Sequence, residues 1–272
     1  MMHTEYESLR RTNVYFFDLD GCVYHGTRLD PDAKLLIEQL QRMGREVYFL
    51  TNNSRDRARE IGVKLSGMGL PVAAERIIAA TDYVCTHVLE TYGSVSVKVA
   101  GSPGLEEAFR VEGIRLLPLH SEETAQLIVI GRDTGFSYRK LESIAEDARN
   151  GAALLSVNPD ASHPGENHRS IPETGALVAS VEYMLGYKID YFGKPAPYLF
   201  HYGIRLCGYQ SEQCVMIGDN LYTDIQGAAK VGMKTVWLRT QHQPFDSDRT
   251  EAIKPDYTMN SMKQLRTIVL RA

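Results

Sequence analysis

The segment Val14-Tyr15-Phe16-Phe17-Asp18-Leu19-Asp20-Gly21 indicates both the fold and the chemistry of this chain. Its apolar run predicts a short strand buried on both faces. Two carboxylates follow at the end of that strand, two residues apart. One such carboxylate can act as a nucleophile and the other as a general acid and base, with a divalent cation between protein and substrate. The segment therefore indicates phosphoryl-group chemistry.

The surrounding sequence is typical of an α/β protein. Short β-branched or aromatic runs alternate with amphipathic stretches, as in a mostly parallel sheet covered by helices. Asp30 followed by Pro31 predicts the N-cap and first residue of a helix that Gly44 ends. The apolar face of that helix is expected at Leu35, Leu36, Leu40 and Met43. Further strands are expected at 46–50, 95–100, 127–131, 153–157, 189–192, 214–217 and 234–238. Further helices are expected at 103–112, 138–149, 174–186, 195–207, 221–231 and 261–271.

Composition and charge exclude several classes of function. A net charge of −4 and a pI near 6.1 give no electrostatic reason to expect nucleic acid or an anionic membrane as partner. No apolar stretch approaches the roughly 18 residues of a membrane helix, and the polar N-terminal segment does not resemble a signal peptide. The 4 cysteines contain no CxxC pair and are expected to be free thiols. These features predict a cytoplasmic protein.

Three apolar runs of the sequence (YFF, VYFL and VMI) end in polar clusters that begin at Asp18, Thr51 and Gly218. In open parallel sheets, ligands bind beyond the carboxyl ends of the strands. Adjacent strands lie about 4.8 Å apart. The three clusters are therefore expected to share one site.

The polar clusters belong to motifs that follow one another along nearly the whole chain: Asp18-Leu19-Asp20-Gly21, Thr51-Asn52-Asn53-Ser54, Gly193-Lys194-Pro195, and Gly218-Asp219-Asn220 with Thr223-Asp224. The set resembles the haloacid-dehalogenase superfamily, and within it the class IIA phosphatases of the NagD and p-nitrophenylphosphatase type. The resemblance implies a Rossmann-like, doubly wound parallel-sheet core formed by residues 1–80 and 188–272. It also implies an α/β cap domain inserted at residues 81–187, which would determine substrate specificity.

The resemblance implies a Mg2+-dependent phosphatase, a phosphoric monoester hydrolase. Asp18 would attack phosphorus to form an aspartyl phosphate that water then hydrolyses, and Asp20 would be the general acid and base. Mg2+ would be held by Asp18, the main-chain carbonyl of Asp20 and Asp219, because this ion prefers oxygen ligands. Asp224 would support the metal through water or Lys194. The residues alone leave two alternatives: a helix cap or turn pair for Asp18 and Asp20, and for Asp224 an acid favoured by the dipole at a helix start.

Thr51 and the main-chain amides of Asn52 and Asn53 are implied phosphate ligands, since a hydroxyl and amides can donate to phosphate oxygens. Lys194 is an implied catalytic and phosphate-binding residue that would also pair with Asp18 and keep it ionised. The second motif could instead be a helix cap, and Lys194 could be a surface lysine at a helix start. The sequence leaves these alternatives open.

Within the expected cap, Asn158-Pro159-Asp160 resembles a loop that faces the active site in this class. Asn158 and Asp160 are therefore candidate specificity residues, with a simple Asx turn as the alternative. His163 and His168 follow, and a solvated loop is the favoured interpretation for both. The family's glycine-rich turn is replaced here by Ile171-Pro172-Glu173-Thr174-Gly175. This departure from the family pattern lies in the cap and not in the core.

The expected partner is a small-molecule phosphate ester, without nucleic acid or membrane. Sugar phosphates, nucleoside monophosphates, phosphoglycolate and pyridoxal phosphate are the substrate classes that the resemblance leaves open. A homodimer through the cap is compatible with it, and the helix near 177–185 would form either cap core or that dimer surface. Two other functions fit the same fold: a phosphotransferase, and a non-catalytic phosphometabolite-binding protein. The latter is expected to lack Asp18, which is present.

Overall fold

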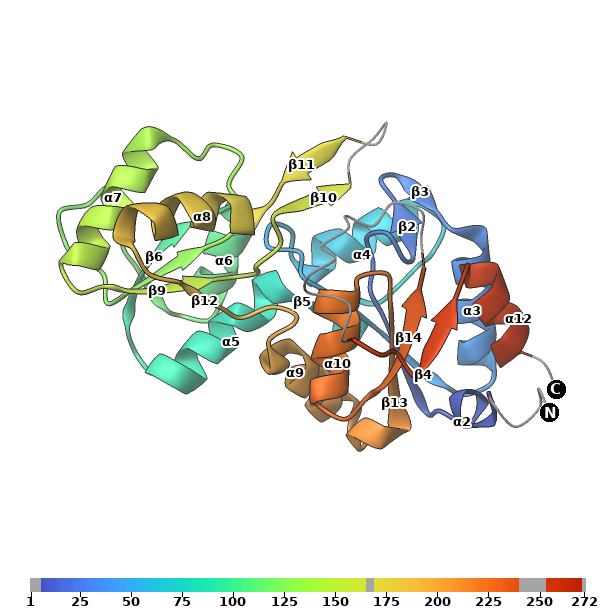
Figure 1. The fold of residues 1–272 in the computed structure, drawn as a ribbon. Coiled ribbons are helices and arrows are strands. Elements are labelled where there is room, and N and C mark those ends of the chain that lie inside the picture. Colours follow the sequence, from blue (N-terminus) through green and yellow to red (C-terminus); the bar gives the residue numbers. More distant parts are fainter. Residues whose placement is uncertain (1–5, 165–168, 240–252, 271–272) are drawn as a thin grey trace. The chain divides into compact units, whose positions relative to one another are not determined.

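A computed structural model describes residues 6–164, 169–239 and 253–270 of the chain (Figure 1). The chain divides into two compact units. Unit 1 comprises residues 1–51, 62–78 and 194–272, and unit 2 comprises residues 52–61 and 79–193. The division falls inside two of the motifs, directly after Thr51 and directly before Lys194. The roles of catalytic core and specificity cap, and the limits 81–187, stay predictions.

Unit 1 is built on a 6-stranded sheet with β1 near its centre. In spatial order the strands are β15 (Tyr257–Met259), β14 (Lys234–Leu238), β13 (Cys214–Gly218), β1 (Val14–Phe17), β4 (Glu46–Thr51) and β5 (Ile77–Ala79). Strand β1 is buried along its whole length and pairs in parallel with β13 and β4. Val14 aligns with both Cys214 and Glu46, so the polar clusters after the three strands begin at the same edge of the sheet.

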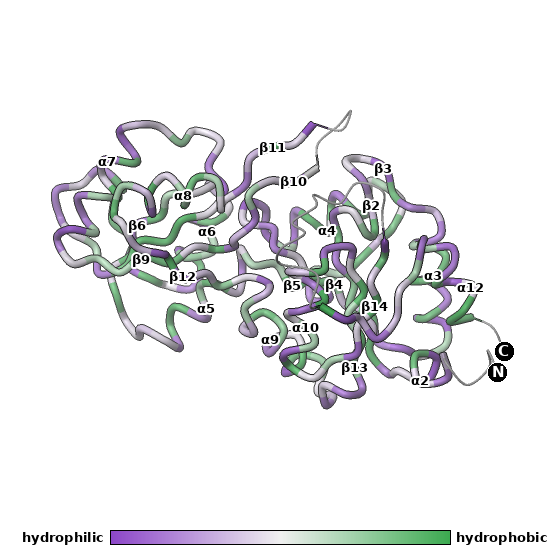
Figure 2. The backbone as a smooth tube through the Cα atoms, viewed as in Figure 1, coloured by the Kyte–Doolittle hydropathy of each residue, from purple (hydrophilic) through white to green (hydrophobic). Residues whose placement is uncertain are grey.

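Helices α3 (Pro31–Arg42) and α12 (Met262–Val269) contact each other on one side of this sheet, and α9 (Pro197–Cys207) and α10 (Gly227–Lys230) lie on the other (Figure 1). In Figure 2, α3 and α12 alternate between hydrophobic and hydrophilic residues, as helices with one buried face do. The smaller elements of unit 1 are α2 (Glu7–Arg10), the hairpin of β2 (Tyr24–His25) and β3 (Arg28–Leu29), and the short turns η1 (Ala74–Arg76), η3 (Ser211–Gln213) and η4 (Leu221–Gln226). The division between the units falls within helix α4 (Ala58–Gly67).

Helix α3 shows which part of the sequence pattern is reliable. Its start is confirmed, because the Asp30 carboxylate accepts from the main-chain N–H groups of the next turn at 2.8 and 2.9 Å. Its apolar face is partly wrong: Leu35 and Met43 are each 47% exposed. The buried residues are Ala33, Leu36, Ile37 and Leu40. These four recur at helical spacing, whereas Leu35 lies off that face.

Unit 2 contains a second parallel sheet of 5 strands. In spatial order they are β12 (Asp190–Tyr191), β9 (Ala153–Ser156), β8 (Leu127–Ile130), β6 (Ser96–Ala100) and β7 (Arg115–Leu116). Its helices are α5 (Ala80–Tyr92), α6 (Pro103–Val111), α7 (Tyr138–Arg149) and α8 (Thr174–Leu185). Ile128 and Ile130 of β8 pack with Ile144 of α7 and Val178 and Val181 of α8. An antiparallel hairpin, β10 (Ser162–Pro164) and β11 (Ser170–Pro172), precedes α8.

The α/β fold class with parallel sheets is confirmed, and every strand and helix placed from the sequence has a counterpart within a few residues. The cysteines are free thiols, as expected. Helix α8 contributes Val178 and Val181 to the core of unit 2, while Tyr183 and Met184 are exposed. Among the residues that the structure describes, no helix combines the length and apolar character needed to span a membrane. The cytoplasmic location and the homodimer stay predictions.

Candidate active site

Asp18 lies in a buried charged cluster of unit 1. Its N–H donates to the carbonyl of Ile217 at 2.9 Å, which continues the pairing of β1 with β13. This bond fixes the main chain of Asp18. One carboxylate oxygen each of Asp18, Asp219 and Asp224 lies within 4.8 Å of the others. Asp18 and Asp224 are buried, and Asp219 is half-buried. The first and fourth motifs thus meet at one edge of the sheet.

Lys194 supplies the positive charge of this cluster. Its ammonium donates to Asp18 Oδ1 at 2.7 Å, to Asp224 Oδ1 at 2.6 Å and to the carbonyl of Leu50 at 3.0 Å. The side chain is 2% exposed, so the alternative of a surface lysine is wrong. Burial alone would lower the pKa of Lys194, but the carboxylates of Asp18 and Asp224 outweigh burial and raise it. The ammonium therefore stays charged.

The carboxylates of the cluster are short of positive charge. Without a bound cation, burial raises the pKa of Asp18 to about 7, although Lys194 pulls it down, and Asp224 adds to the rise. Burial, Asp18 and Asp224 likewise raise the pKa of Asp219 well above its usual range. Three carboxylates facing one ammonium carry an excess of negative charge. A divalent cation would remove this excess.

The donor set fits a hard cation such as Mg2+, which prefers carboxylate oxygens. Asp18 and Asp219 can supply them. Asp224 differs, because its Oδ1 accepts from Lys194 and its Oδ2 accepts from the N–H of Asn220 at 3.1 Å. With both oxygens held by donors, Asp224 fits the predicted supporting role better than a direct ligand role. The main-chain carbonyl of Asp20 stays a predicted ligand.

Two glycines allow the carboxylates to approach the main chain. Gly21 has φ +84°, and a Cβ there would lie 2.4 Å from Asp219 Oδ2. A Cβ on Gly218 would lie 2.2 Å from Asp224 Oδ2. Any side chain at either position would displace a carboxylate of the cluster. Both glycines belong to the predicted motifs, but the reason for them is visible only in three dimensions.

Asp20 has a partner that the sequence did not indicate. Its Oδ2 accepts from the hydroxyl of Tyr24 at 2.7 Å, and the N–H of Gly21 donates to the carbonyl of Tyr24 at 2.9 Å. The ammonium of Lys64 lies 4.0 Å from the centre of the Tyr24 ring. The only signal in the sequence was an aromatic residue four positions after the acid. Tyr24 thus orients the carboxyl group of Asp20.

The loop after β13 is held at both ends. The indole N–H of Trp237 donates to the carbonyl of Asp219 at 2.9 Å. The side-chain oxygen of Asn220 accepts from the N–H groups of Tyr222 and Thr223 at 2.9 and 3.1 Å, which caps the π-helical turn η4. This turn carries Asp224, so the hydrogen bonds of Trp237 and Asn220 help to fix the fourth motif.

The second motif is divided between the units. Thr51 is the last residue of β4 and is buried in unit 1, whereas Asn52 and Asn53 belong to unit 2. The side-chain oxygen of Asn53 accepts from the N–H groups of Arg55 and Asp56 at 2.9 and 2.8 Å. These bonds close an Asx turn ahead of α4, which begins at Ala58, so the Asn53 side chain does not cap that helix. The main-chain amides of Asn52 and Asn53 stay predicted phosphate ligands.

Both cap candidates bind Asn52. The side-chain amide of Asn158 donates to the carbonyl of Asn52 at 2.7 Å, and the side-chain amide of Asn52 donates to Asp160 Oδ2 at 2.9 Å. The N–H of Asp160 donates to Asn158 Oδ1 at 3.0 Å, so the Asx turn exists, with Asn158 as its first residue. Specificity roles for Asn158 and Asp160 stay predictions.

Glu173, in the segment 171–175 where the resemblance implied a glycine-rich turn, is the centre of an ionic network in unit 2. Its Oε1 lies 3.4 Å from Arg132 Nη1 and 3.1 Å from His163 Nδ1, and its Oε2 accepts from the N–H of Thr174 at 3.0 Å. Burial alone would raise the pKa of Glu173, but these three groups outweigh burial and lower it. The solvated-loop interpretation of His163 is therefore wrong, because this residue lies in β10 against Glu173. His168 lies outside the described residues.

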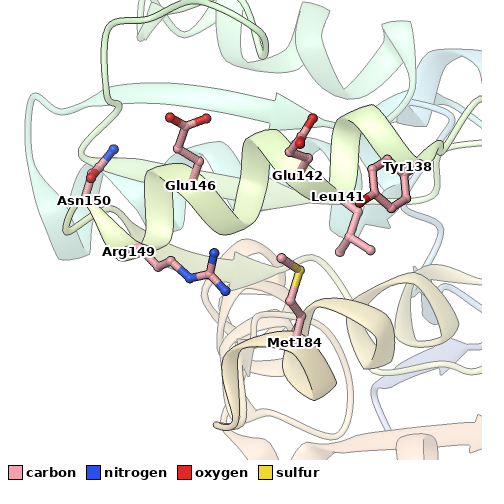
Figure 3. Close-up of a pocket in the computed structure, with 7 residues that line it drawn as sticks. All are labelled: Tyr138, Leu141, Glu142, Glu146, Arg149, Asn150 and Met184. Atoms are coloured by element: carbon pink, nitrogen blue, oxygen red, sulfur yellow. The ribbon is translucent and has the colours of Figure 1, made fainter.

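Figure 3 shows a separate hollow of unit 2, with a volume of about 440 Å3. Its lining residues come from α7, its C-terminal end and α8: Tyr138, Leu141, Glu142, Glu146, Arg149, Asn150 and Met184. None of them belongs to a predicted motif, and the acids Glu142 and Glu146 are exposed. The hollow therefore adds nothing to the candidate site.

Comparison with known proteins connects this geometry with one family. The sequence profile described as "Haloacid dehalogenase-like hydrolase" matches residues 15–115, and a second profile, of HAD-hydrolase-like proteins, matches residues 191–265. The "Acid sugar phosphatase" of Staphylococcus aureus is 28% identical over 256 residues, which is 94% of this chain and 97% of the relative. All four motifs lie inside the two matched segments.

Solved structures agree with the sequence comparison. The crystal structure of 4-nitrophenylphosphatase from Thermotoga maritima has a TM-score of 0.87 at 26% identity, covering 97% of this chain and 99% of that one. A double mutant of a thermostable NPPase from Geobacillus stearothermophilus has a TM-score of 0.83 at 27% identity, covering 93% and 98%. The similarity extends over both units.

Proposed function

This chain belongs to the haloacid dehalogenase-like hydrolases, and on that premise we propose that it is a Mg2+-dependent phosphatase for phosphate monoesters of small metabolites. One observation carries the proposal: the carboxylates of Asp18, Asp219 and Asp224 lie together, and the buried Lys194 pairs with Asp18 and Asp224. The cluster combines a candidate nucleophile, oxygen ligands for a cation and a fixed positive charge. Phosphoryl transfer needs all three.

Asp18 is the proposed nucleophile. Its carboxylate oxygen forms a bond to phosphorus while the bond between phosphorus and the ester oxygen breaks, giving an aspartyl phosphate and an alcohol. Water then attacks the same phosphorus, which releases inorganic phosphate and restores the carboxylate. A carboxylate can attack a phosphate dianion only where negative charge is compensated. Lys194, 2.7 Å from Asp18 Oδ1, supports the ionised form and fixes its direction.

Asp20 is the proposed general acid and base. It protonates the departing ester oxygen in the first step and accepts a proton from the attacking water in the second. The Tyr24 hydroxyl donates to Asp20 Oδ2 at 2.7 Å. We therefore assign Oδ1 of Asp20 to the proton transfers with the ester oxygen and the attacking water. This division of the two oxygens supports the assignment.

The remaining phosphate oxygens are assigned to Thr51, to the amides of Asn52 and Asn53, and to Lys194. Mg2+, held by Asp18, Asp219 and the carbonyl of Asp20, would neutralise phosphate charge and act as a Lewis acid. Both contributions lower the repulsion between the phosphate and Asp18.

A sugar phosphate is the substrate class that we favour, because the Staphylococcus aureus relative is named an acid sugar phosphatase. Nucleoside monophosphates and phosphoglycolate are the alternatives. The leaving group is proposed to be selected by unit 2, with Asp160 as the candidate contact.

The test is a panel of several dozen phosphorylated metabolites and p-nitrophenyl phosphate, assayed with Mg2+ for released inorganic phosphate and for phosphorylated acceptors. A phosphatase releases one phosphate for each ester consumed. Transfer of most phosphate to an added alcohol or sugar would instead identify a phosphotransferase. Binding of esters without any turnover would identify a phosphometabolite-binding protein and contradict the proposal.

A further inference from the structure

The residues that follow Thr51 are held by hydrogen bonds from separate elements of unit 2. The carbonyl of Asn52 accepts from the side-chain amide of Asn158 at 2.7 Å. The carbonyl of Asn53 accepts from the hydroxyl and the N–H of Thr81, in the first turn of α5, at 2.8 and 3.1 Å. Two successive carbonyls are therefore both bound by buried residues of unit 2.

Asn158 is built into unit 2 and has little surface to offer a substrate. It is 1% exposed. Its carboxamide oxygen accepts from the N–H of Asp160 at 3.0 Å, and its carbonyl accepts from the Ser156 hydroxyl at 2.7 Å. The donor end of the same carboxamide is directed to Asn52. The contacts of Asn158 therefore favour an indirect role, in which it holds Asn52, over a direct contact with the leaving group.

Because the peptide group is planar, a contact that fixes a main-chain carbonyl also fixes the direction of the N–H group of the next residue. In a trans peptide the C=O of one residue and the N–H of the next point in opposite directions. When Asn158 holds the carbonyl of Asn52, it therefore also sets the direction of the Asn53 N–H. Thr81 acts in the same way on the next peptide plane. An amide oriented in advance binds an anion without the free-energy loss of ordering it.

Ser54 adds a third attachment. Its hydroxyl lies 2.8 Å from Thr174 Oγ1 and accepts from the N–H of Arg132 at 3.2 Å. On the other side, a Cβ on Gly193 would lie 2.6 Å from the side-chain oxygen of Asn52. The segment is therefore attached to unit 2 at Asn52, Asn53 and Ser54.

We infer that Asn158 and Thr81 are positioning residues: Asn158 holds the carbonyl of Asn52 and so orients the N–H of Asn53, a proposed phosphate ligand, and Thr81 fixes the next peptide plane, between Asn53 and Ser54. This inference rests on the proposed function. It gives Asn158 a role that differs from substrate selection, because the phosphate is common to all substrates. A positioning residue changes phosphate binding equally for every ester, whereas a specificity residue changes the order of preference among esters.

The decisive variant is Asn158→Asp, which has the same size and keeps the acceptor for the N–H of Asp160. It replaces the donor to the Asn52 carbonyl with a carboxylate oxygen. We expect kcat/KM to fall about 10- to 100-fold, by the same factor for every ester, because a buried carbonyl loses its partner. The inhibition constant of inorganic phosphate, which has no leaving group, should rise by a similar factor. Asn150→Asp, at an exposed position of unit 2, is the matched control and should behave as the wild type.

Two results would overturn the inference. One is an unchanged phosphate inhibition constant with an altered order of ester preference, which would make Asn158 a specificity residue. The other is wild-type kinetics on every ester. Assays are run well below the melting temperature of each variant, so that lower stability alone does not change the inhibition constant. If Asn158→Asp does not fold, Thr81→Val is judged by the same two criteria with a smaller expected effect, because the Thr81 N–H remains.

Failure of the proposed function would be visible separately. In that case the wild-type protein itself would release no phosphate from any ester. The inference about Asn158 fails only when the wild type is active and the variant shows one of the two results above.

Discussion

Two buried carboxylates, Asp18 in unit 1 and Glu173 in unit 2, behave in opposite ways although a cation lies beside each. Burial raises the pKa of Asp18 to about 7. Burial also acts on Glu173, but its donors outweigh it and lower the pKa. The difference lies in the neighbours. Asp18 shares one ammonium, Lys194, with Asp224, whereas Glu173 pairs with Arg132 and has further donors around it.

This difference separates a reactive site from a structural one. A cluster with too few cations would be stabilised by a bound metal ion, which suits the proposed site for a metal and a phosphate. A carboxylate with enough donors is stable by itself and holds the segments around it. The experiments below test this distinction, beginning with the largest expected effect.

Removal of the nucleophile should have the largest effect on activity. We expect Asp18→Asn to lower the turnover of p-nitrophenyl phosphate by more than about 10^4-fold, the upper end of general acid–base effects. The fold should persist, because the variant removes one charge from an over-negative cluster. The assay is paired with a thermal melt and with Asp190→Asn, an exposed control in β12. Substantial activity in Asp18→Asn would refute the nucleophile assignment.

Removal of the ammonium should have the largest effect on stability. Lys194→Ala leaves two buried carboxylates without their cation, and breaking a buried pair in this way lowers the free energy of unfolding by about 3–5 kcal/mol. The loss should be smaller at pH 6 than at pH 8, since the remaining carboxylates can take up protons. Urea unfolding at both pH values measures it. Lys188→Ala, in an exposed pair with Glu182, should change stability by about 0–1 kcal/mol.

Asp20→Asn should distinguish the acid–base role from the nucleophile role. We expect kcat on alkyl phosphates to fall by about 10^2-fold or more. The fall on p-nitrophenyl phosphate should be smaller, because a phenolate departs with less need of a proton. The ratio of the two losses is the measurement. Equal losses on both esters would argue against Asp20 as the acid.

The effect of Mg2+ on stability should depend on pH. Between about pH 4 and pH 7 the metal-free folded protein holds a proton on Asp18 that the unfolded chain has released. Its free energy of unfolding therefore falls as pH rises through this window. Mg2+ replaces the proton, so the stabilisation by Mg2+ should grow with pH. At one hundred times the Kd we expect about 2.7 kcal/mol near pH 7.5 and less at pH 5. Two results would contradict the metal assignment. One is the same stabilisation by Mg2+ at both pH values, and the other is no stabilisation when Mg2+ is added to protein first stripped of metal with EDTA.

Glu173→Gln should have the smallest effect and the opposite dependence on pH. Because the pKa of Glu173 is lowered on folding, its stabilising contribution is present above its ordinary pKa and is lost as pH falls through the lowered value. We expect the substitution to lower the free energy of unfolding by about 1–3 kcal/mol above pH 5. This difference from the wild type should become smaller below pH 4. Glu146→Gln, an exposed control in α7, should have little effect. A loss that persists unchanged at low pH would show that the charge of Glu173 is not responsible.

The two regions also differ in how far the sequence predicted them. Asp18 and Asp219 follow β1 and β13, which are neighbours in one parallel sheet, and Asp224 lies in the turn after β13, so the approach of the three acids follows from the order of that sheet. Lys194 follows β12 of the other sheet, and its place beside Asp18 was implied by the motif alone. The bond from Tyr24 to Asp20 depends on side-chain directions in an irregular loop, which no periodicity records. The contact between Arg132 and Glu173 joins segments far apart in the sequence for the same reason.

The boundary between a strand and a helix was not predicted where no glycine, proline or capping residue separates them. Strand β5 (Ile77–Ala79) passes directly into α5 (Ala80–Tyr92) without glycine, proline or a side-chain cap. The apolar run Ile77-Ile78-Ala79-Ala80 fits a buried strand and a buried helix equally well. Thr81, the second residue of α5, was consequently not recognised as a partner of the second motif.

The central claim, that Asp18 becomes phosphorylated during turnover, can be tested directly. The enzyme is mixed with p-nitrophenyl phosphate and Mg2+, quenched in acid within one turnover, and reduced with borohydride, which converts an aspartyl phosphate into homoserine. Mass spectrometry of the peptide that contains both Asp18 and Asp20 then locates the change. We predict homoserine at position 18 in the wild type and none in Asp18→Asn. Homoserine at position 20, or an unmodified peptide from an enzyme that is turning over, would contradict the account.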